Sequence, residues 1–104
     1  MAFGLSEQAR EYIVSAVRKF PEIEKTIIFG SRAMGNSKKG SDVDLAIAGK
    51  NITSRTALKL SSLLNQELPL PYFFDVVVYE NIANDNLKQH IDEHGVVLFP
   101  APPQ

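Results

Sequence analysis

Residues 30–47, GSRAMGNSKKGSDVDLAI, decide the fold and the chemistry expected of this chain. The stretch follows an apolar run at residues 26–29 and holds Asp42 and Asp44 with one residue between them. Residues i and i+2 of an extended strand project from the same face, so these two carboxylates point the same way. Neighbouring like charges repel unless a cation lies between them, and Mg²⁺ commonly binds through one or two carboxylates together with substrate phosphates. Because Ser31 lies in a glycine-flanked turn whose backbone N–H groups can approach phosphate closely, the stretch predicts metal-assisted chemistry on a nucleoside triphosphate.

Length and composition limit the class of protein. A chain of 104 residues is long enough for one domain with a single core. Its 11 basic and 12 acidic residues give a net charge of −1, so no basic field favours nucleic acid or a membrane surface as a partner. No apolar stretch approaches the roughly 20 residues of a membrane-spanning helix, and no secretory signal pattern is visible. The absence of cysteine excludes disulfides and thiolate metal sites. We expect a cytoplasmic protein with one domain at residues 1–99 and a flexible proline-rich tail at 100–104.

Hydrophobic periodicity and breaker residues predict alternating helices and strands. The last predicted helix ends at Gly95, which is expected to act as a left-handed C′ residue. The predicted fold class is α/β (α+β), a small mixed sheet flanked by helices. Helices are expected at residues 6–20, from 53 or 54 onward, and from 81 or 84 to 94; strands are expected at 26–29, 43–48, 72–79 and 96–99.

A third carboxylate, Asp75, is expected beside the first two. A helix separates the second and third predicted strands, and a crossover of this kind joins parallel strands. Parallel neighbours begin at the same edge of a sheet, which brings Asp75 to the edge that holds Asp42 and Asp44. An antiparallel first strand would deliver Gly30 and Ser31 to that edge. The sequence therefore predicts a phosphate-binding turn beside a carboxylate site for two metal ions.

The turn at residues 30–35 leaves some roles open. Its two glycines have the spacing of a P-loop, but Asn36 occupies the position of the obligatory lysine, so that interpretation fails. Arg32 is placed either to clamp a phosphate with two hydrogen bonds or to pair with a nearby acid at a helix start. Ser41 is expected to orient the carboxylate loop rather than to react.

Two histidines lie outside this constellation. His90 and His94 are one helical turn apart, which is the spacing of a zinc pair. No cysteine or evident third ligand accompanies them. The favoured interpretation is a pair of surface histidines near the negative end of a helix, and any further role is left open.

Taken together, residues 30–47 resemble the signature of the DNA polymerase β-like nucleotidyltransferase superfamily, specifically its minimal nucleotidyltransferase (MNT) group. The segments FDVVVY at 74–79 and IDEHGVVLF at 91–99 are also similar to that group, so the resemblance extends over most of the chain. It implies a polymerase β-like nucleotidyltransferase fold.

The resemblance also implies roles for individual residues. Asp42, Asp44 and Asp75 correspond to the catalytic carboxylates that hold two Mg²⁺ ions, and Asp75 corresponds to the base that activates the attacking hydroxyl. Gly30 and Ser31 correspond to the Gly-Ser pair that binds the triphosphate. Arg32 and Ser41, considered above, complete the expected nucleotide-binding residues.

The implied reaction transfers a nucleoside monophosphate, AMP from ATP, to a hydroxyl and releases pyrophosphate. Members of the MNT group usually act with a small helical HEPN protein, as the antitoxin of a toxin–antitoxin pair. The resemblance therefore implies a type VII-like antitoxin that adenylylates a tyrosine of a HEPN toxin, in a homo- or hetero-oligomer. Two alternatives stay open: a non-catalytic module that neutralises its partner by binding, and an enzyme that adds nucleotides to a small RNA.

Overall fold

The computed structural model of this chain describes residues 7–30, 42–68 and 72–100. Its helices and strands follow one another in the predicted order, with a π-helical turn continuing the second helix and a 3₁₀ turn following the third strand. In chain order the elements are α1 (Glu7–Val17), β1 (Lys25–Phe29), β2 (Val43–Ala48), α2 (Ser54–Ser62), η2 (Leu63–Glu67), β3 (Phe74–Val78), η3 (Tyr79–Asn81), α3 (Asp85–His94) and β4 (Val96–Phe99).

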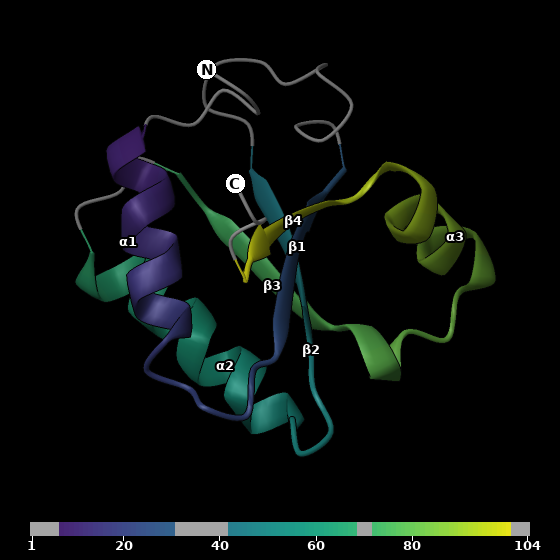
Figure 1. Cartoon of the computed structure of the whole chain (residues 1–104), viewed down its shortest axis with the longest axis horizontal. Helices are drawn as coiled ribbons and strands as arrows, with labels where there is room; N and C mark the ends of the chain where they lie inside the picture. The colour runs from purple at the N-terminus through teal and green to yellow at the C-terminus, as the bar shows by residue number, and fades with distance from the viewer. Residues whose placement is uncertain (1–6, 31–41, 69–71, 101–104) are drawn as a thin grey trace.

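The four strands form one mixed sheet in the order β3-β2-β1-β4 (Figure 1). The central strand β2 pairs antiparallel with β1 and parallel with β3, and β4 pairs antiparallel with β1. The expected mixed sheet is therefore confirmed, together with the directions of its first three strands. The last predicted strand is also present, as a short edge strand.

Helices cover both faces of the sheet. Figure 1 shows α1 and α2 on one side and α3 on the other. Alternate residues of β2 face opposite sides of the sheet. Val43, Leu45 and Ile47 pack in the core beneath α1 and α2. Ala46 packs with Ile91 of α3 on the other side. Since side chains alternate along a strand, Asp44 projects from the face that carries α3.

The helices begin where the sequence places their caps. Thr53 caps α2, where its side chain and that of Thr56 form a reciprocal capping box. Asn84 caps α3 and accepts hydrogen bonds from two backbone N–H groups of the first turn. The predicted buried face of α1 is confirmed, with Ile13 and Val17 fully buried. The predicted cap Ser6 and the tail residues 101–104 lie outside the described residues.

Gly95 corrects one expectation. Its backbone is extended, with φ −67° and ψ 148°, rather than left-handed. A β-carbon at this position would collide with the carbonyl oxygen of Ile91 and with the side chain of Ile27. Glycine is required because the chain passes from α3 to β4 in close contact with β1, where a side chain would not fit. The backbone does not need a positive φ here.

The third strand is shorter than predicted at both ends: Tyr72 and Phe73 precede it, and Tyr79 already belongs to the 3₁₀ turn. Within the described ranges, no helix combines the length and the apolar character needed to cross a bilayer.

A buried hydroxyl in β1 provides a test of the packing. Thr26 is fully buried, and its Oγ1 has no hydrogen-bond partner among the described groups. Thr26→Val keeps the shape and removes the unpaired hydroxyl, so we expect the free energy of unfolding to rise by about 1 kcal/mol. Thermal melting should show an increase in Tm of about 4–8 °C.

The matched control is Thr56→Val. Thr56 is equally buried, but its hydroxyl donates to Oε2 of Glu22 at 2.8 Å. This variant should lose stability. A fall in Tm for Thr26→Val comparable to that of the control would contradict the assignment of Thr26 as unpaired.

Candidate active site

The strand register brings two predicted carboxylates side by side. Asp44 of β2 lies opposite Asp75 of β3 in the parallel ladder, and opposite Phe29 of β1 in the antiparallel one. Asp42 is exposed and precedes β2 directly. The three carboxylates therefore lie at the end of the sheet where β1 finishes and where β2 and β3 begin (Figure 1).

Burial of the neighbouring residues fixes the face from which these carboxylates project. Val43 and Phe74 are fully buried in the core beneath α1 and α2. Their successors Asp44 and Asp75 consequently point to the opposite face, the one that carries α3. Asp44 is half-buried, whereas Asp75 on the edge strand is exposed.

The electrostatics of the site are unfavourable for an isolated carboxylate. Burial raises the pKa of Asp44 above the ordinary aspartate value, and the nearby charges of Asp75 and Asp42 raise it further. A bound cation would relieve this repulsion. The donor set consists of oxygens, which suits a hard dication such as Mg²⁺.

The described residues do not form a complete metal site by themselves. Within residues 7–30, 42–68 and 72–100, no three acidic or histidine side chains lie close enough together to hold a metal ion. The expected triad of Asp42, Asp44 and Asp75 is thus not a closed three-ligand cage. The adjacent pair Asp44 and Asp75 fits a site that is completed by substrate phosphates, the mode in which Mg²⁺ commonly binds.

Gly30 is held against the carboxylate site. Its φ of +80° is the left-handed conformation that glycine adopts without strain. A β-carbon here would collide with the carboxylate of Asp44. The predicted glycine is therefore required twice, by its backbone angle and by its contact with Asp44. The predicted Ser31, Arg32 and Ser41 lie outside the described residues, and their roles remain predictions.

His90 is a site residue that the sequence interpretation missed. Its Nε2 accepts a hydrogen bond from the backbone N–H of Gly30 at 3.0 Å. The ring is half-buried and lies edge-on to Phe29, with centroids 6.2 Å apart. The expectation of a solvated surface histidine is wrong for His90, although it fits the exposed His94. One signal was present: His90 lies three residues after Leu87 and next to Ile91, both on the inward side of α3.

Asn65 is a second residue that the sequence does not single out. Its side-chain amide donates to the carbonyl of Phe74 at 2.9 Å, and its Oδ1 accepts from the Phe74 N–H at 2.7 Å. This pair of bonds imitates a neighbouring strand and secures the start of β3, directly before Asp75. Because Asn65 lies in the π-helical turn, helical periodicity gives no indication of this contact.

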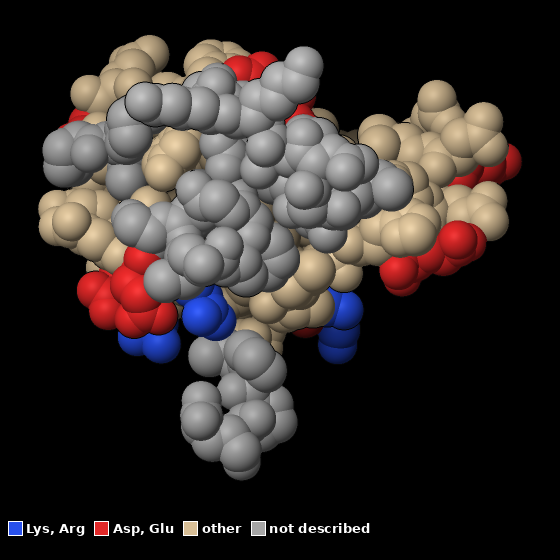
Figure 2. Space-filling view, turned by 90° about the horizontal axis from the view of Figure 1, so that it is seen from above, with Lys and Arg blue, Asp and Glu red and all other residues tan. Residues whose placement is uncertain are grey.

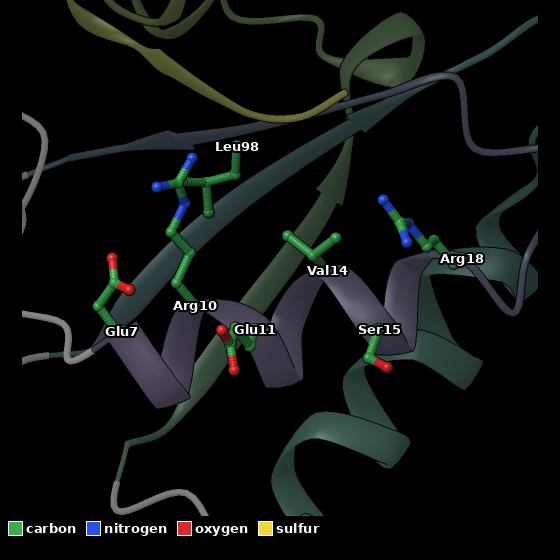
Figure 3. Close-up of a pocket in the computed structure, with 7 residues that line it drawn as sticks. All are labelled: Glu7, Arg10, Glu11, Val14, Ser15, Arg18 and Leu98. Atoms are coloured by element: carbon green, nitrogen blue, oxygen red, sulfur yellow. The ribbon is translucent and has the colours of Figure 1, made fainter. Parts of the chain in front are cut away.

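A hollow of about 390 Å³ lies between α1 and β4, and none of the three carboxylates lines it. Figure 3 shows that α1 supplies its acidic and basic side chains, with Leu98 of β4 at its edge. These groups carry no arrangement suited to nucleotide chemistry. On the face seen in Figure 2, from above, the visible lysines and arginines form small separate groups.

Comparisons with known proteins agree with this geometry. The family model described as "Polymerase beta, Nucleotidyltransferase" matches residues 11–104. The crystal structure of a toxin–antitoxin with AMP-PNP contains a chain that matches with a TM-score of 0.72 at 23% identity, over 86% of this chain and 72% of that one. No curated protein gives a significant match.

Two further solved structures share the fold. That of the toxin–antitoxin MntA-HepT matches with a TM-score of 0.68 at 20% identity, over 90% of this chain and 72% of the other. That of a tri-AMPylated Shewanella oneidensis HEPN toxin in complex with MNT antitoxin also gives 0.68 at 20% identity, over 91% and 72%. The expected polymerase β-like nucleotidyltransferase fold is confirmed.

The raised pKa of Asp44 predicts how stability varies with pH in the metal-free protein. A folded-state pKa above the unfolded value means that the folded protein binds the Asp44 proton more tightly. Stability is therefore lost as the pH rises from about 4 through the raised pKa. In EDTA at pH 7, Asp44→Asn should raise Tm, and its advantage over wild type should shrink as the pH falls through the raised pKa of Asp44 toward about 4.

Asp42→Asn removes the same charge from the same edge and serves as the control. Because Asp42 is exposed, its gain in Tm should be smaller. An Asp44→Asn protein that melts no higher than wild type at pH 7, or whose advantage grows on acidification, would contradict the electrostatic account.

Proposed function

This chain belongs to the polymerase beta nucleotidyltransferase family, and from that membership we propose that it transfers AMP from ATP to a hydroxyl group of a partner protein. The proposed partner is a HEPN-domain toxin, the acceptor is a tyrosine of that toxin, and the chain acts as a type VII-like antitoxin in the cytoplasm. The observation that carries the proposal is the placement of Asp44 opposite Asp75, with the Gly30 turn packed against Asp44.

Each part of the site has a role in the proposed reaction. The turn that begins at Gly30, with Ser31 and Arg32, binds the triphosphate. The acceptor oxygen attacks the α-phosphorus, the bond from this phosphorus to the bridging oxygen of the β-phosphate breaks, and pyrophosphate leaves. Asp75 receives the proton of the attacking hydroxyl. Its exposure on the edge strand leaves it accessible to an acceptor that comes from outside the chain.

Asp44 and Asp75, with Asp42 at the same edge of the sheet, are the residues that would hold Mg²⁺ together with substrate phosphates. The chemistry supplied by bound Mg²⁺ is a lowered pKa of the attacking hydroxyl and neutralisation of charge on the α-phosphate and the departing pyrophosphate. The fit rests on the oxygen donors and on the raised pKa of Asp44, which is caused first by burial and then by repulsion from Asp75 and Asp42. Before substrate arrives, the same repulsion keeps these carboxylates poised to accept a cation.

An apolar surface beside Asp75 supports an acceptor borne by a protein. A hollow of about 350 Å³ between α2 and β3 includes Asp75 among its lining residues. It also includes Leu58 and Phe73, whose exposed fractions of 71% and 58% mark them as the exposed large apolar side chains of the described residues. Exposed apolar groups of this kind are typical of protein interaction sites. Two of the similar solved structures are toxin–antitoxin complexes, one with a tri-AMPylated HEPN toxin.

The proposal is tested by following the α-phosphate of ATP. The purified chain is incubated with α-³²P-labelled ATP, Mg²⁺ and the helical protein encoded by the neighbouring reading frame. We expect label on a tyrosine of that protein, and a loss of about 100-fold or more in rate for Asp75→Asn, the usual contribution of a general base. Asp44→Asn should lose at least as much.

Glu80→Gln is the matched control, since Glu80 closely follows β3 but lies at the opposite end of the sheet from Asp75. It accepts a hydrogen bond from the Gly49 N–H at 3.1 Å, a bond that glutamine can keep. This variant should label the partner at the wild-type rate. Full neutralisation of the partner by the aspartate variants, with no label at any time, would identify a non-catalytic binding module instead, and label on RNA would identify an RNA-directed enzyme.

A further inference from the structure

His90 joins α3 to the start of the phosphate-binding turn. The bond from the Gly30 N–H to His90 Nε2 spans 60 residues of sequence and links β1 to a helix on one face of the sheet. Gly30 is the residue whose left-handed backbone packs against Asp44. The contact therefore acts at the place where the turn and the carboxylate site meet.

The histidine ring is held in a defined orientation. Phe29 lies edge-on to it at 72°, with ring centroids 6.2 Å apart, and the ring of His94 lies 5.4 Å away on the next helical turn. A ring nitrogen accepts a hydrogen bond only when it carries no proton. The bond to Gly30 therefore requires the tautomer with the proton on Nδ1.

From these contacts we propose that His90 is a positioning residue for the nucleotide: it holds the left-handed Gly30 backbone against the Asp44 carboxylate, where the nucleotide and its cation are proposed to bind. Without His90, the left-handed turn loses its only described link to α3. The nucleotide role rests on the proposed function, whereas the hydrogen bond itself does not.

Matched substitutions separate this role from simple packing. His90→Leu keeps an apolar side chain of similar bulk and removes the acceptor, while His90→Gln places Oε1 close to where Nε2 lies. His94→Leu makes the same change one turn further along, at a residue that makes no hydrogen bond to Gly30 among the described residues. The readouts are the Kd of AMP-PNP with Mg²⁺ by calorimetry and the exchange rate of the Gly30 amide by NMR.

We expect His90→Leu to weaken AMP-PNP binding about tenfold, the value of one hydrogen bond, and to speed exchange of the Gly30 amide by a similar factor. His90→Gln should restore both to within about threefold of wild type, and His94→Leu should leave both unchanged. The ¹⁵N shifts of wild-type His90 should report an unprotonated Nε2 and a protonated Nδ1, a measurement that requires no variant.

Equal binding by His90→Leu and wild type, or equal losses in the His90 and His94 variants, would overturn the positioning role. A wild-type Gly30 amide that exchanges like an exposed one would overturn the bond itself. Failure of the wild-type protein to bind AMP-PNP would instead overturn the proposed function, and the amide exchange and imidazole shifts would still decide the bond.

Discussion

The parallel register between β2 and β3 is the constraint on which the candidate site depends. It sets Asp44 opposite Asp75, and the antiparallel pairing of β1 with β2 brings the Gly30 turn to the same place. Side chains alternate along a strand, so a slip of one residue would turn Asp75 toward the apolar core. Burial of Val43 and Phe74 opposes that slip, and the two hydrogen bonds of Asn65 to the Phe74 backbone secure the edge.

The same arrangement lowers the stability of the folded chain when no cation is bound. Asp44 is half-buried beside two other carboxylates, which disfavours its charged form in the absence of a cation. Destabilising groups of like charge are common at sites that bind a ligand of the opposite charge. Gly30 belongs to the same site, because only a residue without a side chain lets the chain approach the Asp44 carboxylate here. Nucleotide and cation would then stabilise an edge that the folded chain holds at some loss of stability.

The sequence predicts much of this arrangement because its strongest signals are local. The bounds of β2 match the predicted strand at 43–48, and a helix between two strands correctly predicts that β2 and β3 are parallel. His90 and Asn65 escape prediction because their roles depend on tertiary contacts across the sheet and on a π-helical turn that shifts the helical period. Gly95 ends α3 as predicted, but glycine is needed there because a side chain would collide with Ile27. A single sequence does not show that contact.

The central claim is that the edge formed by Asp44 and Asp75 binds a divalent cation together with the nucleotide. Crystals grown with AMP-PNP and Mn²⁺ test it directly through the anomalous signal of manganese. The account predicts a peak within coordination distance of a carboxylate oxygen of Asp44, with phosphate oxygens completing the site. A well-ordered nucleotide bound elsewhere, or bound at this edge with manganese remote from Asp44, would contradict it.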